Sequence, residues 1–286
     1  MCTVTLIARK RGYALGMNRD EKLSRPKGLK PAIRHLRGRT VLSPSEPAGG
    51  TWIAINDRRI TFALINWYSV ARTAEIDPES RGVVINQVIT TDSPDAAHAA
   101  LAELSLKHIN PFRLIGVFPG ICEVIEWRWD LKRLVRRNFS WRTRQWVSSG
   151  FNETTAQRIR GMTFRRLATR SSAGTIAWLR RLHRSHSPAS GPFSTCMHRA
   201  DAATVSYTEV AVNSSNVKMG HVDSAPCKCA SAPEQLRMAC PMNSAVGISE
   251  IFSIRARAGH SRALTERLDL TAEIFRSANE IELKRP

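Results

Sequence analysis

The chain has 286 residues, of which 42% are hydrophobic and 23% charged, a balance typical of a globular protein with a sizeable core. Its formal net charge is +19, which indicates a surface that attracts anions. No stretch approaches the roughly 18 consecutive apolar residues of a membrane span. The N-terminus turns basic after its apolar residues, the reverse of a secretory signal, so we expect a cytoplasmic protein.

The positive charge is concentrated between residues 127 and 170, where twelve Lys or Arg stand against two acidic residues. No nucleic-acid-binding motif accompanies this segment. We therefore interpret it as a solvated basic face and expect no specific nucleic-acid partner. A peripheral contact with an anionic membrane remains open, and the sequence does not indicate an oligomeric state.

Seven segments carry the apolar pattern of β-strands: residues 2–8, 13–17, 51–55, 60–66, 112–117, 121–127 and 204–212. Three segments are predicted to be helical: residues 94–104, 154–167 and 175–182. Ser93 is the expected N-cap of the first helix and Asn152 or Thr154 that of the second. In the second helix, Ile159, Met162 and Leu167 are expected on one side. This order of strands, helices and strands favours layered sheets with helices on their outer faces.

The chain divides into three parts by composition. Residues 1–227 are expected to form one domain. Residues 228–248 are small and polar and lack periodicity, which is typical of a linker, and we expect a linker over residues 228–260. Residues 261–286 show apolar residues near helical spacing and predict a C-terminal amphipathic helix.

Cys2 begins the first predicted strand and becomes the first residue if Met1 is removed. An N-terminal cysteine carries a nucleophile and a base together, because its α-amino group, with a pKa of about 7.7–8.0, can accept the thiol proton. The thiolate would attack a carbonyl carbon, and donors opposite it would stabilise the oxyanion. The alternative is a small buried cysteine with no chemical role.

Charged residues close the first predicted hairpin. Since Asp20 would fold back beside the start of the first strand, its carboxylate could bind the α-ammonium group and Arg19 could hold the Cys2 thiolate. The alternative interpretation is a surface turn with an Arg–Asp pair that contributes little to stability.

Ordered blocks of this sequence resemble the NRDE family, also called the transport and Golgi organisation 2 family. The matching blocks run in order over about residues 1–227: residues 1–3, 14–21, 25–26, 52–57, 63–67, 80–82, 110–112, 148–150, 182–184, 196–199, 201 and 204–206. That family is similar to the choloylglycine hydrolases and penicillin V acylases. The resemblance implies an α+β fold, a four-layer αββα sandwich of the N-terminal-nucleophile hydrolase type.

The resemblance also implies site residues. Cys2 would be the nucleophile, Asp20 would lie beside the α-amine, and Asn66 would help to form the oxyanion hole. Those acylases place an Arg three residues before the Asp, whereas Met17 holds that position here and Arg19 adjoins Asp20. Four further residues are expected to contact the substrate: Asn18, Ser148, Asn152 and Arg199. Ser148 falls near the position of a second acylase Asn, and Asn152 is offset from it. Arg199 would be an anion clamp at the mouth of the site.

The remaining cysteines and histidines favour no metal site. Cys227 and Cys229 lack the spacing and the second pair of a zinc motif. Cys196, Met197 and His198 offer ligands suited to haem iron, but consecutive residues on a strand point to alternate faces. His183 and His186 are expected to be solvated at the end of an Arg-rich helix.

Three functions follow as alternatives. The first is an amidohydrolase that acts on a small-molecule substrate through Cys2 and requires no metal or organic cofactor. The second is a non-catalytic haem or lipid carrier that uses the same pocket, with haem as a ligand. The third is a basic protein that binds nucleic acid or a membrane surface.

Overall fold

The computed structural model describes residues 2–70, 73–74, 78–229 and 231–240. The expected C-terminal helix over residues 261–286 lies outside the described residues. Within the described ranges, none of the helices is both long and apolar enough to cross a membrane.

The first sheet is antiparallel and contains the N-terminal hairpin at its centre. β1 pairs with β2 on one side and with β10 on the other. The strand order is β10-β1-β2-β11-β12-β13, with these bounds: β1 Cys2–Ala8, β2 Tyr13–Lys22, β10 Arg144–Ser148, β11 Ala202–Val212, β12 Asn216–Val222 and β13 Glu234–Ala239. The hairpin expected at the N-terminus is thus flanked by a strand on each side.

The second sheet is an antiparallel meander in the order β3-β4-β5-β6-β7-β8-β9. Its strands are β3 Leu29–Leu36, β4 Arg39–Ser45, β5 Ile53–Asn56, β6 Thr61–Asn66, β7 Phe112–Phe118, β8 Glu123–Trp129 and β9 Leu134–Ser140. The predicted turn after β5 forms because the Asn56 side chain accepts hydrogen bonds from the N–H groups of Arg58 and Ile60. Arg59 in that turn adopts a φ of 66°, a conformation that glycine adopts more readily.

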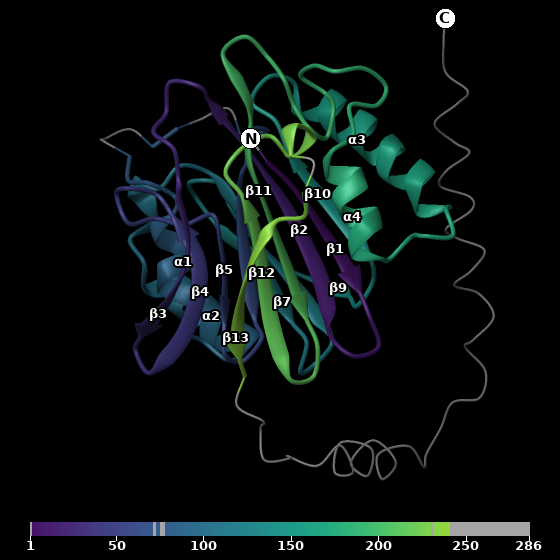
Figure 1. The fold of residues 1–286 in the computed structure, drawn as a ribbon. Coiled ribbons are helices and arrows are strands. Elements are labelled where there is room, and N and C mark those ends of the chain that lie inside the picture. Colours follow the sequence, from purple (N-terminus) through teal and green to yellow (C-terminus); the bar gives the residue numbers. More distant parts are fainter. Residues whose placement is uncertain (1, 71–72, 75–77, 230, 241–286) are drawn as a thin grey trace, which may run out of the picture. The chain divides into compact units, whose positions relative to one another are not determined.

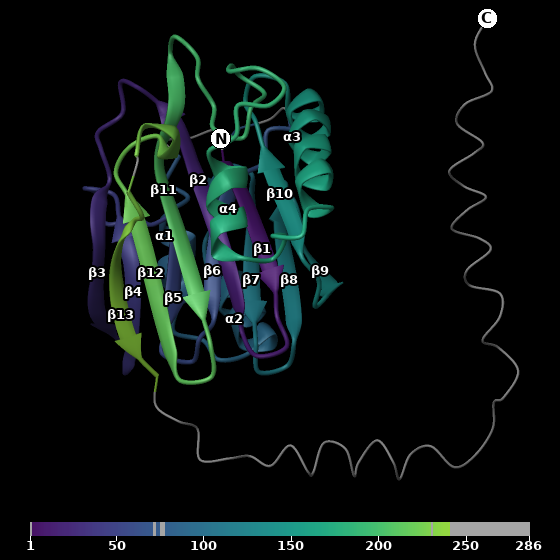
Figure 2. The same cartoon turned by 45° about the vertical axis from the view of Figure 1, so that its right-hand side comes forward.

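The helices are α1 Val83–Val88, α2 Pro94–Glu103, α3 Glu153–Ala168 and α4 Ile176–His183, with short 3₁₀ turns η1 Leu106–His108 and η2 Pro226–Lys228. α1 and α2 lie against the seven-stranded sheet, and α3 and α4 lie against the six-stranded sheet (Figures 1 and 2). Ser93 caps α2 and Asn152 caps α3, as predicted.

Three apolar cores separate these layers. The central core joins the two sheets and contains Val4 and Leu15 from one and Ile55 and Ile115 from the other. A second core lies under α1 and α2, and a third, around Trp178, lies under α3 and α4. Helices, two face-to-face sheets and helices again make the predicted four-layer αββα sandwich, which the structure confirms.

Two expectations about local structure are wrong. The predicted linker from residue 228 contains β13, which pairs with β12 through residues 234–239. On α3, Met162 is 53% exposed, whereas the buried face carries Ala156, Arg160, Thr163 and Leu167. The apolar residues of this helix are too few to identify its buried face, because a buried arginine occupies part of it.

The basic segment forms strands as well as a helix. Arg128 belongs to β8, Arg144 to β10 and Arg165 to α3, and together with Arg142 and Trp67 they line a groove of about 760 Å³. Figure 2 shows β10 and α3 as neighbouring elements on this side of the molecule. Four of the twelve basic residues of this segment therefore lie around one hollowed surface.

Candidate active site

Cys2 lies at the first position of β1, a central strand of the six-stranded sheet. It pairs with Ser148 of β10 and with Arg19 of β2. Its residue surface is 8% exposed, and its backbone N–H donates to Ser148 Oγ over 3.1 Å. The neighbouring strands β10 and β2 hold Cys2 in place from both sides. This agrees with the predicted hairpin, which starts at Cys2.

A cavity of about 210 Å³ opens next to Cys2. Its walls come from both sheets and from the loops before α1 and before β7. Four residues expected at the catalytic centre contribute to it, namely Cys2, Arg19, Asp20 and Asn66. The structure thus brings together residues separated by up to sixty-four positions in the chain.

Arg19 lies on the same face of the sheet as Cys2, because the two residues are directly opposite in the β1–β2 ladder. Its guanidinium group donates to Glu46 Oε1 over 2.9 Å and stacks 4.6 Å from the centre of a Trp52 ring. The side chain is thus fixed in the wall of the cavity rather than free at a surface turn.

Asp20 points to the opposite face, since neighbouring residues on a strand alternate. Its partners there are Arg160 of α3, whose Nη1 donates to Oδ2 over 3.2 Å, and Thr204, whose hydroxyl donates to Oδ1 over 2.6 Å. Both side chains of the Asp20–Arg160 pair are completely buried. The alternative interpretation, a surface turn with an Arg19–Asp20 pair, is therefore wrong, because both residues are buried and each has a partner on its own side of the sheet.

Burial raises the pKa of the Cys2 thiol above its ordinary value, and the Asp20 carboxylate also raises it. The N-terminal amino group, the Asp20 backbone N–H and the Arg19 guanidinium group lower this pKa. Because burial is the largest of these effects, the thiol keeps its proton at neutral pH. A base is therefore needed before Cys2 can act as a nucleophile.

Asn66 and Arg81 face Cys2 across the cavity walls. The Asn66 amide donates to the Tyr68 hydroxyl over 2.7 Å, so this donor lies at the end of β6 as expected. Arg81 is a site residue that our sequence reasoning missed, and its Nε donates to the carbonyl oxygens of Asn110 and Pro111. Burial lowers the pKa of Arg81, and the charges of ionised Tyr68 and, to a smaller extent, of ionised Cys2 raise it. Arg81 lies in residues 80–82, one of the blocks that resemble the family, and this position could have identified it.

The structure places the expected substrate-contacting residues differently. Ser148 touches the backbone of Cys2, whereas Asn152 caps α3 through a bond from Thr155 N. Asn18 is fully buried on the helix-facing side, where its amide donates to the carbonyl oxygens of His183 and Thr195. Arg199 pairs with Asp201 and stacks on Phe151, outside the residues that line the Cys2 cavity. Of these four, only Ser148 contacts Cys2.

The expectation that His183 is solvated is wrong. His183 is completely buried at the end of α4, between Asn18 and Thr5. Burial, with a smaller effect of the Arg160 charge, lowers its pKa to about 3. The buried face of α4 extends to its last residue, His183. The arginines next to His183 in the sequence had indicated an exposed helix end.

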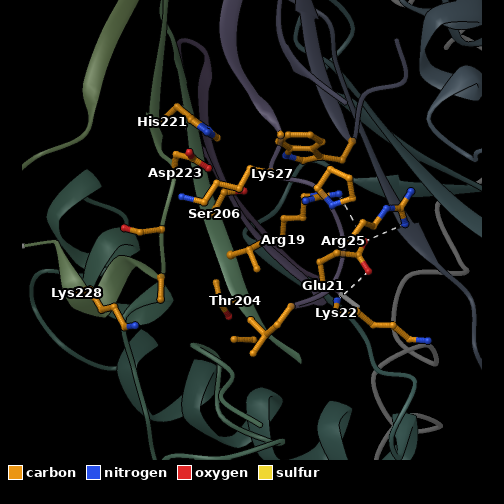
Figure 3. Close-up of a pocket in the computed structure, with 18 of the residues that line it drawn as sticks. Arg19, Glu21, Lys22, Arg25, Lys27, Thr204, Ser206, His221, Asp223 and Lys228 are labelled. Atoms are coloured by element: carbon orange, nitrogen blue, oxygen red, sulfur yellow. Dashed lines mark hydrogen bonds and ion pairs between the residues drawn. The ribbon is translucent and has the colours of Figure 1, made fainter. Parts of the chain in front are cut away.

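A second cavity, of about 280 Å³, adjoins the first, since Arg19, Glu21, Arg25 and Trp52 line both. Figure 3 shows Lys27, His221 and Asp223 close together on one side of this cavity and Lys228 on another. The cavity therefore combines an apolar wall around Trp52 with several ammonium groups. Such a cavity is suited to an anionic ligand with an apolar body.

Arg19→Gln is expected to slow alkylation of Cys2 by iodoacetamide several-fold at neutral pH. Removing this cation raises the thiol pKa, so the thiolate fraction falls. The measurement is the pH–rate profile of alkylation, with Arg25→Gln as a matched control, because Arg25 contacts the same Glu46 carboxylate but is half-exposed. Identical profiles for wild type and Arg19→Gln would contradict the placement of Arg19 beside the thiol.

Known proteins were compared with this chain. The structure of penicillin V acylase from Agrobacterium tumefaciens is 8% identical and covers 84% of this chain and 86% of its own, with a TM-score of 0.50. A mutant of conjugated bile acid hydrolase from Clostridium perfringens is 8% identical and covers 83% and 96%, with a TM-score of 0.47. The likeness to the acylase supports the αββα fold. No curated protein sequence matches the chain.

The family model described as transport and Golgi organisation 2 matches residues 1–124. This stretch contains the blocks around Cys2, Asp20 and Asn66 on which the resemblance was first based, and the predicted resemblance is confirmed there. Residues 1–124 are thus similar to the transport and Golgi organisation 2 family.

Proposed function

We propose that this protein is a cysteine amidohydrolase of the N-terminal-nucleophile type, which cuts a C–N amide bond of a small-molecule substrate. The observation that carries this proposal is the position of Cys2. It starts a central strand, lines a cavity together with Arg19 and Asn66, and has its backbone nitrogen held by Ser148 Oγ. The fold of the chain supports the same chemistry.

The proposed reaction begins with removal of Met1, which frees the α-amine of Cys2. Because burial keeps the thiol protonated, the α-amine, with an ordinary pKa of about 7.7–8.0, takes the thiol proton. The thiolate then adds to the amide carbon, and the carbonyl electron pair moves to oxygen. Asn66, which lines the same cavity, would donate to that oxyanion once its amide turns from Tyr68.

Collapse of the tetrahedral intermediate breaks the C–N bond. The leaving nitrogen takes the proton from the α-ammonium group and departs as an amine, which leaves a thioester on Cys2. Water, deprotonated by the same α-amine, attacks the thioester carbon and releases the carboxylic acid and the thiol. No cofactor takes part in these steps.

The adjoining cavity favours an anionic substrate. Lys22, Lys27 and Lys228 line it together with Trp52, so a carboxylate could bind the ammonium groups while an acyl chain packs on the indole ring. We infer that the amide substrate carries a negative charge and an apolar acyl group. The basic groove near β10 would allow peripheral contact with an anionic membrane, in keeping with a cytoplasmic location.

The same lysine-lined cavity favours a second candidate function, a non-catalytic carrier of haem or of an acylated lipid. Haem propionates and fatty carboxylates offer the charge that these lysines would bind. In that case the ligand occupies the cavity without turnover, and Cys2 has no chemical role.

Comparison of wild type with Cys2→Ala and Cys122→Ala separates these functions. We expect intact mass to show loss of Met1, iodoacetamide to label Cys2, and 5-acylamino-2-nitrobenzoates, which are anionic nitroanilides, with short and long acyl groups to be hydrolysed. Cys2→Ala should lose this hydrolysis, and Cys122→Ala, which removes an exposed thiol, should keep it. A retained Met1, or undiminished hydrolysis by Cys2→Ala, would refute the amidohydrolase. A hemin titration that shifts the haem absorption band equally in wild type and Cys2→Ala, without hydrolysis, would support the carrier.

A further inference from the structure

Four potential metal ligands meet at one point beyond α4. His186 lies in the loop that follows α4, Cys196 and His198 lie on the returning part of that loop, and Cys227 belongs to η2. Their ligand atoms all lie within 4.8 Å of one another. Cys196 is buried and the other three residues are half-buried.

Three of the six distances between the ligand atoms match a tetrahedral zinc site. His198 Nε2 lies 3.2 Å from His186 Nε2, 3.6 Å from Cys196 Sγ and 3.5 Å from Cys227 Sγ. With Zn–N near 2.05 Å and Zn–S near 2.3 Å, tetrahedral geometry separates two nitrogens by about 3.4 Å and a nitrogen from a sulfur by about 3.6 Å. The three measured edges agree with these values to within about 0.2 Å.

Hydrogen bonds alone do not account for the cluster. The Nε2 atom of an imidazole carries either one hydrogen or one lone pair in the plane of the ring, so it forms a single good hydrogen bond. His198 Nε2 nevertheless has three polar neighbours within 3.6 Å. A cation at the centre would satisfy all four side chains at once.

We propose that His186, Cys196, His198 and Cys227 bind one Zn²⁺ ion. Two thiolates and two imidazoles form the donor set that selects zinc, and the two thiolates neutralise the charge of the ion. Four protein ligands close the coordination sphere, so the ion is structural. The arrangement does not fit a [2Fe–2S] cluster, in which each iron has its own pair of protein ligands. Here His198 contacts all three other ligands.

The backbone already holds the ligands near their positions. Cys196 N donates to Ser185 O over 3.0 Å and His198 N donates to Gly191 O over 3.2 Å. These bonds fold the loop back on itself, so that Cys196 and His198 point to the same side and Met197 to the other. Three consecutive residues cannot all face one ion, but Cys196 and His198, two positions apart, can.

The zinc site would also brace Asp20. Met197, between two of the ligands, donates its N–H to Thr204 Oγ1 over 2.8 Å, and that hydroxyl donates to Asp20 Oδ1 over 2.6 Å. The ion would tie this loop to the turn that follows β12 and so fix the position of Thr204. None of the four ligands lines the Cys2 cavity, whereas His198 lines the adjoining cavity.

The test is metal content of the full chain purified after expression with added zinc, measured by plasma mass spectrometry. We expect about one zinc per wild-type chain and at least a tenfold loss in Cys227→Ser and His198→Asn. Cys229→Ser is the matched control, because its thiol lies two positions from Cys227 and outside the cluster; it should keep its zinc. Equal zinc in Cys227→Ser and wild type would overturn the proposal.

A spectroscopic measurement covers variants that fail to fold. Wild-type protein stripped of metal and titrated with Co²⁺ should show the visible bands of tetrahedral cobalt together with thiolate-to-cobalt charge transfer. Added Zn²⁺ should bleach both. Absence of these bands and of zinc, or a disulfide between Cys196 and Cys227 detected by mass spectrometry in freshly purified protein, would show that the cluster is not a metal site.

Discussion

Replacing Arg160 with methionine is expected to lower the free energy of unfolding by about 3–5 kcal/mol. The change removes the guanidinium group that faces the buried Asp20 carboxylate, and both side chains of this ion pair are completely buried. It also removes the bond from Arg160 Nη1 to Thr3 Oγ1, which measures 2.7 Å. Chemical unfolding monitored by tryptophan fluorescence at pH 7 measures the loss.

The matched control is Lys30→Met, which breaks the Lys30–Glu234 pair, whose side chains are 77% and 83% exposed. We expect no measurable change there, since water screens exposed pairs. Asp20→Asn should cost nearly as much as Arg160→Met, and the double variant less than the sum of the two. If Arg160→Met were as stable as Lys30→Met, the buried ion pair would not hold α3 to the sheet.

This buried pair changes how variants of the candidate site are interpreted. If Asp20 lay in a surface turn, Asp20→Asn would change the free energy of unfolding by no more than about half a kcal/mol. Because Asp20 supports the packing of α3, a slower reaction of Cys2 in that variant would mix chemistry with loss of structure. Arg19→Gln is the cleaner probe, since Glu46 keeps a second partner in Arg25.

Local patterns predicted the centre of the fold well. The hairpin that starts at Cys2, the turn at Asn56 and the caps at Ser93 and Asn152 depend on residues close together in the chain, and each forms as predicted. Family blocks added the four-layer arrangement and the meeting of Cys2 with Asn66, which local patterns cannot supply.

Strands at the sheet edges were missed because their sequences are not apolar. β9 and β13 are largely exposed, and the burial of β3 follows no strict alternation. Such strands are specified by pairing with a neighbour rather than by their own residues. The cluster of His186 with Cys227 was missed for a related reason, because its members are far apart in the chain and lack a short spacing motif.

His183 is expected to make the protein sensitive to acid. Its pKa is about 3 in the folded protein, against an ordinary value of about 6.5 in the unfolded chain. The unfolded chain therefore gains a proton first as the pH falls. This contribution to stability is complete above pH 6.5 and is lost between about pH 6.5 and 3, at about 1.4 kcal/mol per pH unit, or about 2.7 kcal/mol by pH 4.5.

The measurement is the free energy of unfolding of wild type and His183→Gln between pH 7 and 4.5. Glutamine does not titrate in this range, so the variant should start less stable at pH 7, having lost the bonds to Asn18 and Thr5, and then fall less steeply. His221, whose pKa burial lowers to about 4, acts in the same direction and leaves a residual slope. His35→Gln, an exposed change on β3, should keep the wild-type slope. Parallel curves for wild type and His183→Gln would mean that the pKa of His183 is the same in the folded protein and the unfolded chain, which would contradict this prediction.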